Sequence, residues 1–221
     1  MHGVPCGPRG LSAEGENTMW KTVLALAIGA WVLLELGAAL AAGDAAAGKT
    51  KSALCVACHG PDGNSANPEW PKLAGQQAEY IVKQLQDFKS GARQNPLMTG
   101  IAAGLSETDM ENLAAYFSSQ KVKVVGVTDA ELAKRGERLY RGGSRKMQVS
   151  ACMACHGPAG QGVPPRFPSV SGQHATYSEI QLQAFKEGKR RNEIMRAIAA
   201  RMSKDEIKAV AVYMSGLEPA R

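Results

Sequence analysis

Aromatic residues are scarce in this chain. Phenylalanine, tryptophan and tyrosine together make up 5% of its 221 residues. The sequence also lacks any run in which apolar and polar residues alternate with the period of two that a half-buried strand requires, so no β-sheet is expected. The patterned segments have helical spacing instead and predict an all-α fold. Because large rings are so few, small helical units of this chain need an additional element to stabilise their cores.

A nucleic-acid-binding motif is also lacking, although the formal net charge is +6. Residues 42–120 contain 6 Lys and Arg against 8 Asp and Glu, whereas residues 121–221 contain 18 against 9. The basic part has no interleaved aromatic residues, which excludes nucleic acid as the expected partner. Two explanations of this positive charge stay open. It steers the protein onto an acidic partner, or it only keeps the protein soluble.

The chain contains an internal duplication. Residues 55–120 align without a gap on residues 152–217, and 29 of the 66 positions are identical. Such self-similarity at a fixed offset, here 97 residues, indicates two copies of one unit. We therefore expect two tandem domains, residues 42–120 and 128–221, joined by a linker at residues 121–127.

Residues 1–41 have the pattern of an export leader. Met19 precedes a lysine, an apolar run covers residues 23–34, and small residues end at Ala41, where a signal peptidase would cleave. We interpret Met19 as the true initiator. The length would also permit a retained anchor, but Glu35 disfavours one because a carboxylate in hydrocarbon is costly. A periplasmic protein is expected, with at most a loose association with the membrane surface.

Both copies contain the motif Cys-x-x-Cys-His. Its three side chains share one face of a helix because they stand at positions i, i+3 and i+4. Two thiols on one face can add to the two vinyl groups of a haem, while the histidine ligates the iron. The residues are Cys55, Cys58 and His59 in the first copy and Cys152, Cys155 and His156 in the second. The sequence therefore predicts two covalently attached haem c groups.

Three other uses of paired cysteines fit less well. The two pairs are further apart than the pairs of a structural zinc site usually are. A thioredoxin-like redox pair is expected beside a βαβ pattern, which this chain lacks. Structural disulfides suit an exported protein, but they do not explain why a histidine follows each pair.

Met98 and Met195 are the predicted sixth ligands of the two irons. They keep the 97-residue offset, whereas Met110 and Met202 align with Ile207 and Leu105 and are expected to fill apolar cores. A thioether opposite a histidine raises the potential of a haem and completes its coordination. A filled coordination sphere favours electron transfer over catalysis, so neither an enzyme nor a small-molecule substrate is expected.

Pro71 and Pro168 each stand 12 residues after a motif histidine. A ligating imidazole usually donates its second N–H to a fixed acceptor, and we expect the carbonyl groups of these prolines to accept those bonds. The alternative is that both prolines only shape turns.

Two glycines interrupt helical patterns, where glycine costs about 1 kcal/mol relative to alanine. We expect close helix contacts at both positions, between Gly48 and Tyr116 and between Gly136 and Tyr213. The helix that contains Gly136 is expected to begin with a capping box, Thr128-x-x-Glu131.

The sequence resembles the class I cytochromes c, and most closely the dihaem cytochrome c4 family. The likeness covers residues 43–217. It is carried by Cys-Val-Ala-Cys-His-Gly-Pro-Asp-Gly-Asn-Ser at 55–65, Pro-Lys-Leu-Ala-Gly-Gln-Gln at 71–77, Leu-Ala-Ala-Tyr-Phe-Ser-Ser-Gln at 113–120 and Gly-Gln-His at 172–174. The resemblance implies a periplasmic electron carrier with two tandem class I cytochrome c domains, each holding a His/Met haem, related by a pseudo-twofold axis. Ser169 departs from the lysine that often follows the second haem proline in this family.

The expected partners are redox proteins. They are a terminal oxidase, a membrane cytochrome complex or a small donor such as a blue-copper protein. One alternative is a dihaem cytochrome subunit of a larger dehydrogenase of the flavocytochrome type. A dihaem peroxidase is disfavoured, because that chemistry needs an iron with an open or displaceable position.

Overall fold

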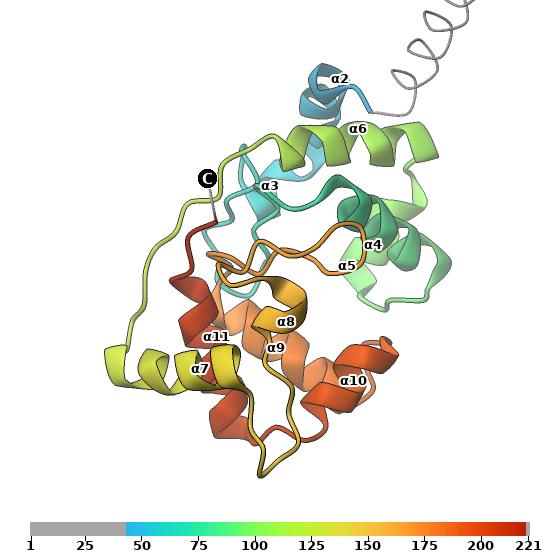
Figure 1. Cartoon of the computed structure of the whole chain (residues 1–221). Helices are drawn as coiled ribbons and strands as arrows, with labels where there is room; N and C mark the ends of the chain where they lie inside the picture. The colour runs from blue at the N-terminus through green and yellow to red at the C-terminus, as the bar shows by residue number, and fades with distance from the viewer. Residues whose placement is uncertain (1–42, 220–221) are drawn as a thin grey trace, which may run out of the picture. The chain divides into compact units, whose positions relative to one another are not determined.

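Two sets of helices follow one another in the same order along the chain, as the computed structural model shows (Figure 1). The first half contains α2 (Ala45–Lys51), the 3-10 turn η1 (Ser52–Leu54), α3 (Val56–His59), α4 (Ala78–Ser90), α5 (Pro96–Ala103) and α6 (Glu107–Ser118). The second half contains α7 (Ala130–Gly142), α8 (Met153–His156), α9 (Ala175–Lys186), α10 (Glu193–Ala199) and α11 (Lys204–Ser215). The predicted all-α fold is confirmed.

The structure describes residues 43–219, and both halves belong to one compact unit. The expected leader, with Met19 and the cleavage site after Ala41, lies outside the described residues. Within residues 43–219, no helix has the length and apolar character needed to cross a membrane. The same residues contain no strand, only two isolated bridges, Ser144 with Val149 and Val163 with Phe167.

Side-chain caps define where the helices begin. Ser106 opens α6 and Ser203 opens α11, each with a reciprocal capping box. The expected capping box at Thr128 is wrong. The side chain of Asp129 instead accepts a hydrogen bond from the backbone N–H of Leu132 at 2.9 Å, so α7 begins one residue later than predicted.

Helices α5 and α10 were not predicted from the sequence. Asn95 caps the first, with Pro96 as its first residue, and Asn192 caps the second. Each asparagine side chain accepts a hydrogen bond from the backbone N–H of a methionine, Met98 at 3.0 Å and Met195 at 2.9 Å. The two predicted ligands therefore stand in the first turn of a short helix.

In each half the first helix packs against the last one (Figure 1), and a glycine lies at the contact. A Cβ atom at Gly48 of α2 would lie 1.9 Å from the carbonyl oxygen of Asn112 and 2.9 Å from the Cβ of Tyr116. At Gly136 of α7 it would lie 2.1 Å from the carbonyl oxygen of Ala209 and 2.9 Å from the Cβ of Tyr213. The expected close contacts are confirmed, and they bring α2 onto α6 and α7 onto α11.

Candidate haem sites

Each Cys-x-x-Cys-His motif forms a single helical turn. In α3 the backbone N–H of His59 donates to the carbonyl of Cys55 at 2.8 Å, and in α8 that of His156 donates to Cys152 at 2.9 Å. This turn brings the two thiols and the imidazole of each motif to one face. A tyrosine hydroxyl holds the loop after each turn, since Tyr116 donates to the carbonyl of Pro61 at 2.8 Å and Tyr140 to that of Gly157 at 2.7 Å.

The motif histidines are oriented by the two prolines. The Nδ1 atom of His59 lies 2.9 Å from the carbonyl oxygen of Pro71, and that of His156 lies 2.8 Å from the carbonyl oxygen of Pro168. Since a carbonyl only accepts, Nδ1 carries the proton in both rings and Nε2 keeps its lone pair. Burial lowers the pKa of each imidazole, although the proline bond opposes this shift. Both rings are therefore neutral at neutral pH, the form that binds iron.

The four motif cysteines are free thiols, with no disulfide among residues 43–219. Burial raises the pKa of Cys55 and of Cys152 to about 11, and the neighbouring motif cysteine adds to each shift. A catalytic or redox-active cysteine has the opposite property, a lowered pKa. The part of the chain that the structure describes also contains no cluster of three His, Cys, Asp or Glu side chains that could hold a metal ion. The raised pKa values of Cys55 and Cys152 disfavour the thioredoxin-like alternative.

The predicted methionine ligands are both partly buried. Met195 on α10 packs against the same apolar cluster as Cys152, a cluster that includes Leu182 of α9 and Met202. Met98 occupies the equivalent position on α5, which contacts α4. Met110 and Met202 are each 1% exposed and lie in the two cores, so the structure separates these core methionines from the pair at the 97-residue offset.

The available groups fit haem c. Each half offers two unpaired thiols on one helix face, a neutral imidazole with Nε2 available, and a partly buried thioether. Thioether and imidazole are the two axial groups that favour electron transfer over oxygen or peroxide chemistry.

Two glutamines at equivalent positions connect the halves close to these histidines. The side chain of Gln76 receives the N–H of Ser169 at 3.0 Å and donates to its carbonyl at 2.9 Å. The side chain of Gln173 does the same to Lys72, at 2.9 Å in both directions. Lys72 directly follows Pro71, and Ser169 directly follows Pro168. These are the prolines whose carbonyl groups accept hydrogen bonds from the motif histidines. A glutamine of each half therefore forms hydrogen bonds with the residue that follows the histidine-binding proline of the other half. We call these two sets of hydrogen bonds the glutamine contacts.

Further contacts between the halves break the symmetry. The Nζ atom of Lys72 donates to the carbonyl oxygens of Lys123 in the linker and Gly172 in the second half, at 2.5 and 2.9 Å. The equivalent residue of the second half, Ser169, has a short hydroxyl in place of this long ammonium side chain. The ring of His174 lies 2.9 Å from the carbonyl oxygen of Ser65, a contact that Gln77 replaces in the other copy by donating to Phe167 at 2.9 Å. The sequence analysis did not predict these interface residues. The signal that could have found them is the repeat, because Gln76 and Gln173, like Gln77 and His174, stand 97 residues apart.

Comparison with known proteins agrees with this arrangement. The family model described as Cytochrome c matches residues 45–121 and again residues 133–218. A cytochrome c4 from Azotobacter vinelandii is 49% identical over 195 residues, which cover 82% of this chain and 92% of the relative. A thiosulfate dehydrogenase electron acceptor from Stutzerimonas stutzeri is 42% identical over 169 residues, covering 74% of this chain and 78% of that protein. The crystal structure of reduced recombinant cytochrome c4 from Pseudomonas stutzeri superimposes with a TM-score of 0.77 at 48% identity, covering 80% of this chain and 100% of that one.

Proposed function

Since the chain belongs to the cytochrome c4 family and is an electron carrier with two covalently bound haem c groups, we propose that it passes single electrons in the periplasm from a respiratory donor to a terminal oxidase. The observation that supports this most directly is the pair of glutamine contacts, which join the two haem sites into one unit next to both histidine acceptors. Bound haem c supplies a one-electron iron couple, and everything else in the transfer depends on how the chain holds it.

We assign the following roles to the residues of the two sites. Cys55 and Cys58 in the first domain, and Cys152 and Cys155 in the second, form the thioether bonds. His59 with Met98, and His156 with Met195, are the axial ligand pairs, and the carbonyls of Pro71 and Pro168 fix the two imidazoles. We place the domains at residues 42–120 and 128–221, with residues 121–127 as the linker and residues 1–41 as the cleaved leader.

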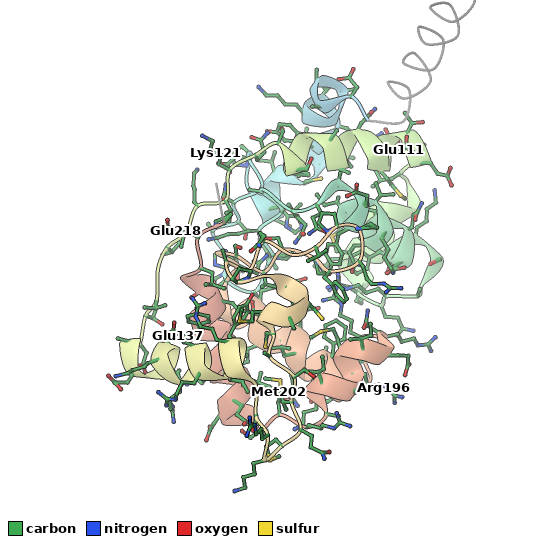
Figure 2. The ribbon with its side chains drawn as sticks, in the orientation of Figure 1. Glu111, Lys121, Glu137, Arg196, Met202 and Glu218 are labelled. Carbon is green, nitrogen blue, oxygen red and sulfur yellow. The ribbon has the colours of Figure 1, made fainter. Side chains whose placement is uncertain are left out.

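The distribution of surface charge supports docking of a partner with an acidic face on the second domain. Exposed Lys204 and Lys208 of α11 occupy the positions of Glu107 and Glu111 in α6. Figure 2 shows Glu111 on α6 and Arg196 on α10, where the first half has the neutral Thr99. Helix α6 contains three acidic residues and no basic one, whereas α11 contains two lysines and two acidic residues. The second half is therefore the less negative of the two, which orients an approaching acidic protein toward it.

The proposal is tested with the reduced holoprotein and washed membranes of the source organism. We expect reoxidation coupled to oxygen uptake, inhibition of both by cyanide, and a rate that falls as salt screens the basic surface. Cell fractionation should recover the protein with the periplasmic contents. Rapid peroxide turnover by the purified protein, or no oxidation by any membrane fraction, would contradict an oxidase donor.

A thiosulfate dehydrogenase is a second candidate for the electron donor. One relative is described as the electron acceptor of a thiosulfate dehydrogenase, and acceptance of electrons from such an enzyme is compatible with the same two haems. Reduction of this protein by thiosulfate in the presence of a purified thiosulfate dehydrogenase tests this donor. A stable complex with the dehydrogenase in gel filtration would favour the subunit alternative over a free carrier.

The glutamine contacts give a prediction on coupling between the haems. Replacing Gln76 or Gln173 by alanine leaves a partly buried backbone N–H and C=O without partners, which costs about 1–3 kcal/mol of stability. We expect each variant to lower Tm and to slow electron exchange between the haems after flash reduction. Gln86→Ala is the control, because this glutamine lies exposed on α4. Unchanged exchange in both variants would show that the contacts do not couple the two sites.

A further inference from the structure

Two arginines occupy equivalent positions in the halves, Arg93 after α4 and Arg190 after α9, one repeat of 97 residues apart. Each guanidinium stacks on a phenylalanine of its own half. The distance from the guanidinium carbon to the ring centroid is 4.6 Å both for Arg93 on Phe88 and for Arg190 on Phe185. We call Arg93 and Arg190 the arginine pair.

The arginine pair shares its hydrogen-bond acceptors across the domain boundary. The side-chain oxygen of Gln84 accepts from Arg93 at 2.6 Å and from Arg190 at 2.9 Å. That of Gln181 accepts from both arginines at 2.8 Å. Because each amide oxygen binds both guanidinium groups, the two positive charges lie side by side.

The remaining polar contacts of the arginine pair are also neutral. Arg93 donates to the hydroxyl of Tyr177 at 3.0 Å, and Arg190 donates to the hydroxyl of Tyr80 at 2.6 Å. Burial alone would raise the pKa of Tyr177, yet the two guanidinium groups together lower it. The two guanidinium groups therefore make the electrostatic environment at the boundary positive.

This concentration of positive charge lacks a matching anion in the chain. No ion pair within residues 43–219 includes Arg93 or Arg190. Asp87 acts on Arg190 only through space, and its carboxylate is bound by Lys83. Partly buried charges are normally paired, and two adjacent guanidinium groups need more compensation than one shared carboxylate supplies.

We propose that the arginine pair binds propionate carboxylates of both haem c groups where the two domains meet. Every haem c carries propionates, and the planar guanidinium is the side chain best suited to bind carboxylates through two hydrogen bonds. Each arginine precedes the methionine of its own half by five residues, so the pair lies at the start of both methionine-bearing segments. The inference rests on the two bound haems and is independent of which donor and acceptor the protein serves.

The consequence is that one arginine influences both haems. With a guanidinium removed, propionate charge near both irons is less compensated, which favours the ferric state in both domains and lowers both potentials. Each of the variants Arg93→Gln and Arg190→Gln is expected to shift both waves of an optical redox titration downward. We expect a change of at least tenfold in each equilibrium constant, which corresponds to about 59 mV for a one-electron couple.

Two further variants separate this role from general effects of charge and folding. Arg145→Gln removes the same charge from an exposed position, and both waves should stay in place. Arg93→Lys keeps the charge but loses the planar geometry, so its potentials should stay near those of the unchanged protein while the propionate bending band in resonance Raman spectra moves. A haemochrome assay establishes that both haems are attached in every variant.

The outcomes are distinct. A shift of both waves in Arg93→Gln and in Arg190→Gln, with a changed propionate band, supports the proposal. A shift confined to the haem of the substituted half, or no shift beyond that of Arg145→Gln, overturns it. If Arg93→Gln or Arg190→Gln does not incorporate haem, the test rests on Arg93→Lys. An unchanged propionate band in Arg93→Lys also overturns the proposal. Failure to donate to oxidase membranes would instead count against the proposed function, since the titration requires no partner.

Discussion

Replacing Met195 with leucine is expected to remove the sixth ligand of the second haem while leaving the fold intact. Leucine and methionine have similar volumes, and such exchanges usually cost less than about 1.5 kcal/mol. We expect the methionine–ferric charge-transfer band of that haem to disappear and its potential to fall, because the thioether favours the reduced state. Affinity for carbon monoxide should rise at least about tenfold, equivalent to 1.4 kcal/mol of binding free energy.

The control for this change is the same substitution at Met202. Met202 is 1% exposed in the core of the same half, so Met202→Leu repeats the exchange without touching a predicted ligand. Its optical spectrum and carbon monoxide affinity should match those of the unchanged protein. An undiminished charge-transfer band in Met195→Leu, or a weakened band in Met202→Leu, would show that another residue is the ligand. Met98→Leu applies the same test to the first haem.

Replacing Gly136 with valine is expected to separate α7 from α11. The first atom of any side chain there would lie 2.1 Å from the carbonyl oxygen of Ala209, and backbone atoms cannot move aside as the end of a flexible side chain can. Overpacking of this kind costs about 3 kcal/mol or more. For a unit of this size we expect Tm to fall by about 6–12 °C, measured by circular dichroism of the holoprotein.

Gly142 provides the matched control, because it is the last residue of the same helix. No atom outside its chain neighbours and the backbone of its own helix lies within 4 Å of a Cβ built there, so Gly142→Val tests the effect of valine on α7 without the helix crossing. Its Tm should stay close to that of the unchanged protein. Equal stability of the two variants would mean that the crossing at Gly136 tolerates a side chain and that glycine is not required there.

The fold and the cofactor could be predicted from the sequence because both depend on local, repeated patterns. The helical spacing of apolar residues and the two Cys-x-x-Cys-His motifs are each contained within a few turns of chain. The 97-residue offset also distinguished Met98 and Met195 from the methionines that fill the cores. The contact of each motif histidine with a proline carbonyl followed from the ordinary need of an imidazole for a fixed acceptor.

Details that depend on competition between neighbours were harder to predict. Thr128 and Asp129 are adjacent and both can cap a helix, so the pattern alone did not decide which one begins α7. Helices α5 and α10 have 8 and 7 residues, too few for a clear apolar period, and only their asparagine caps indicate them. The contacts between the halves join residues about 100 positions apart, and no local pattern encodes such pairs.

The glutamine contacts have a consequence for modular engineering of this protein. Gln173 of the second half supports the backbone beside Pro71, and Gln76 of the first half supports the backbone beside Pro168. A domain expressed alone would lose the external support of its own histidine acceptor, so its midpoint potential would not equal its potential in the intact chain. A chimaera that exchanges one half for that of a relative must carry over the matching glutamine. In this respect the chain is comparable to a homodimer whose two subunits have been fused.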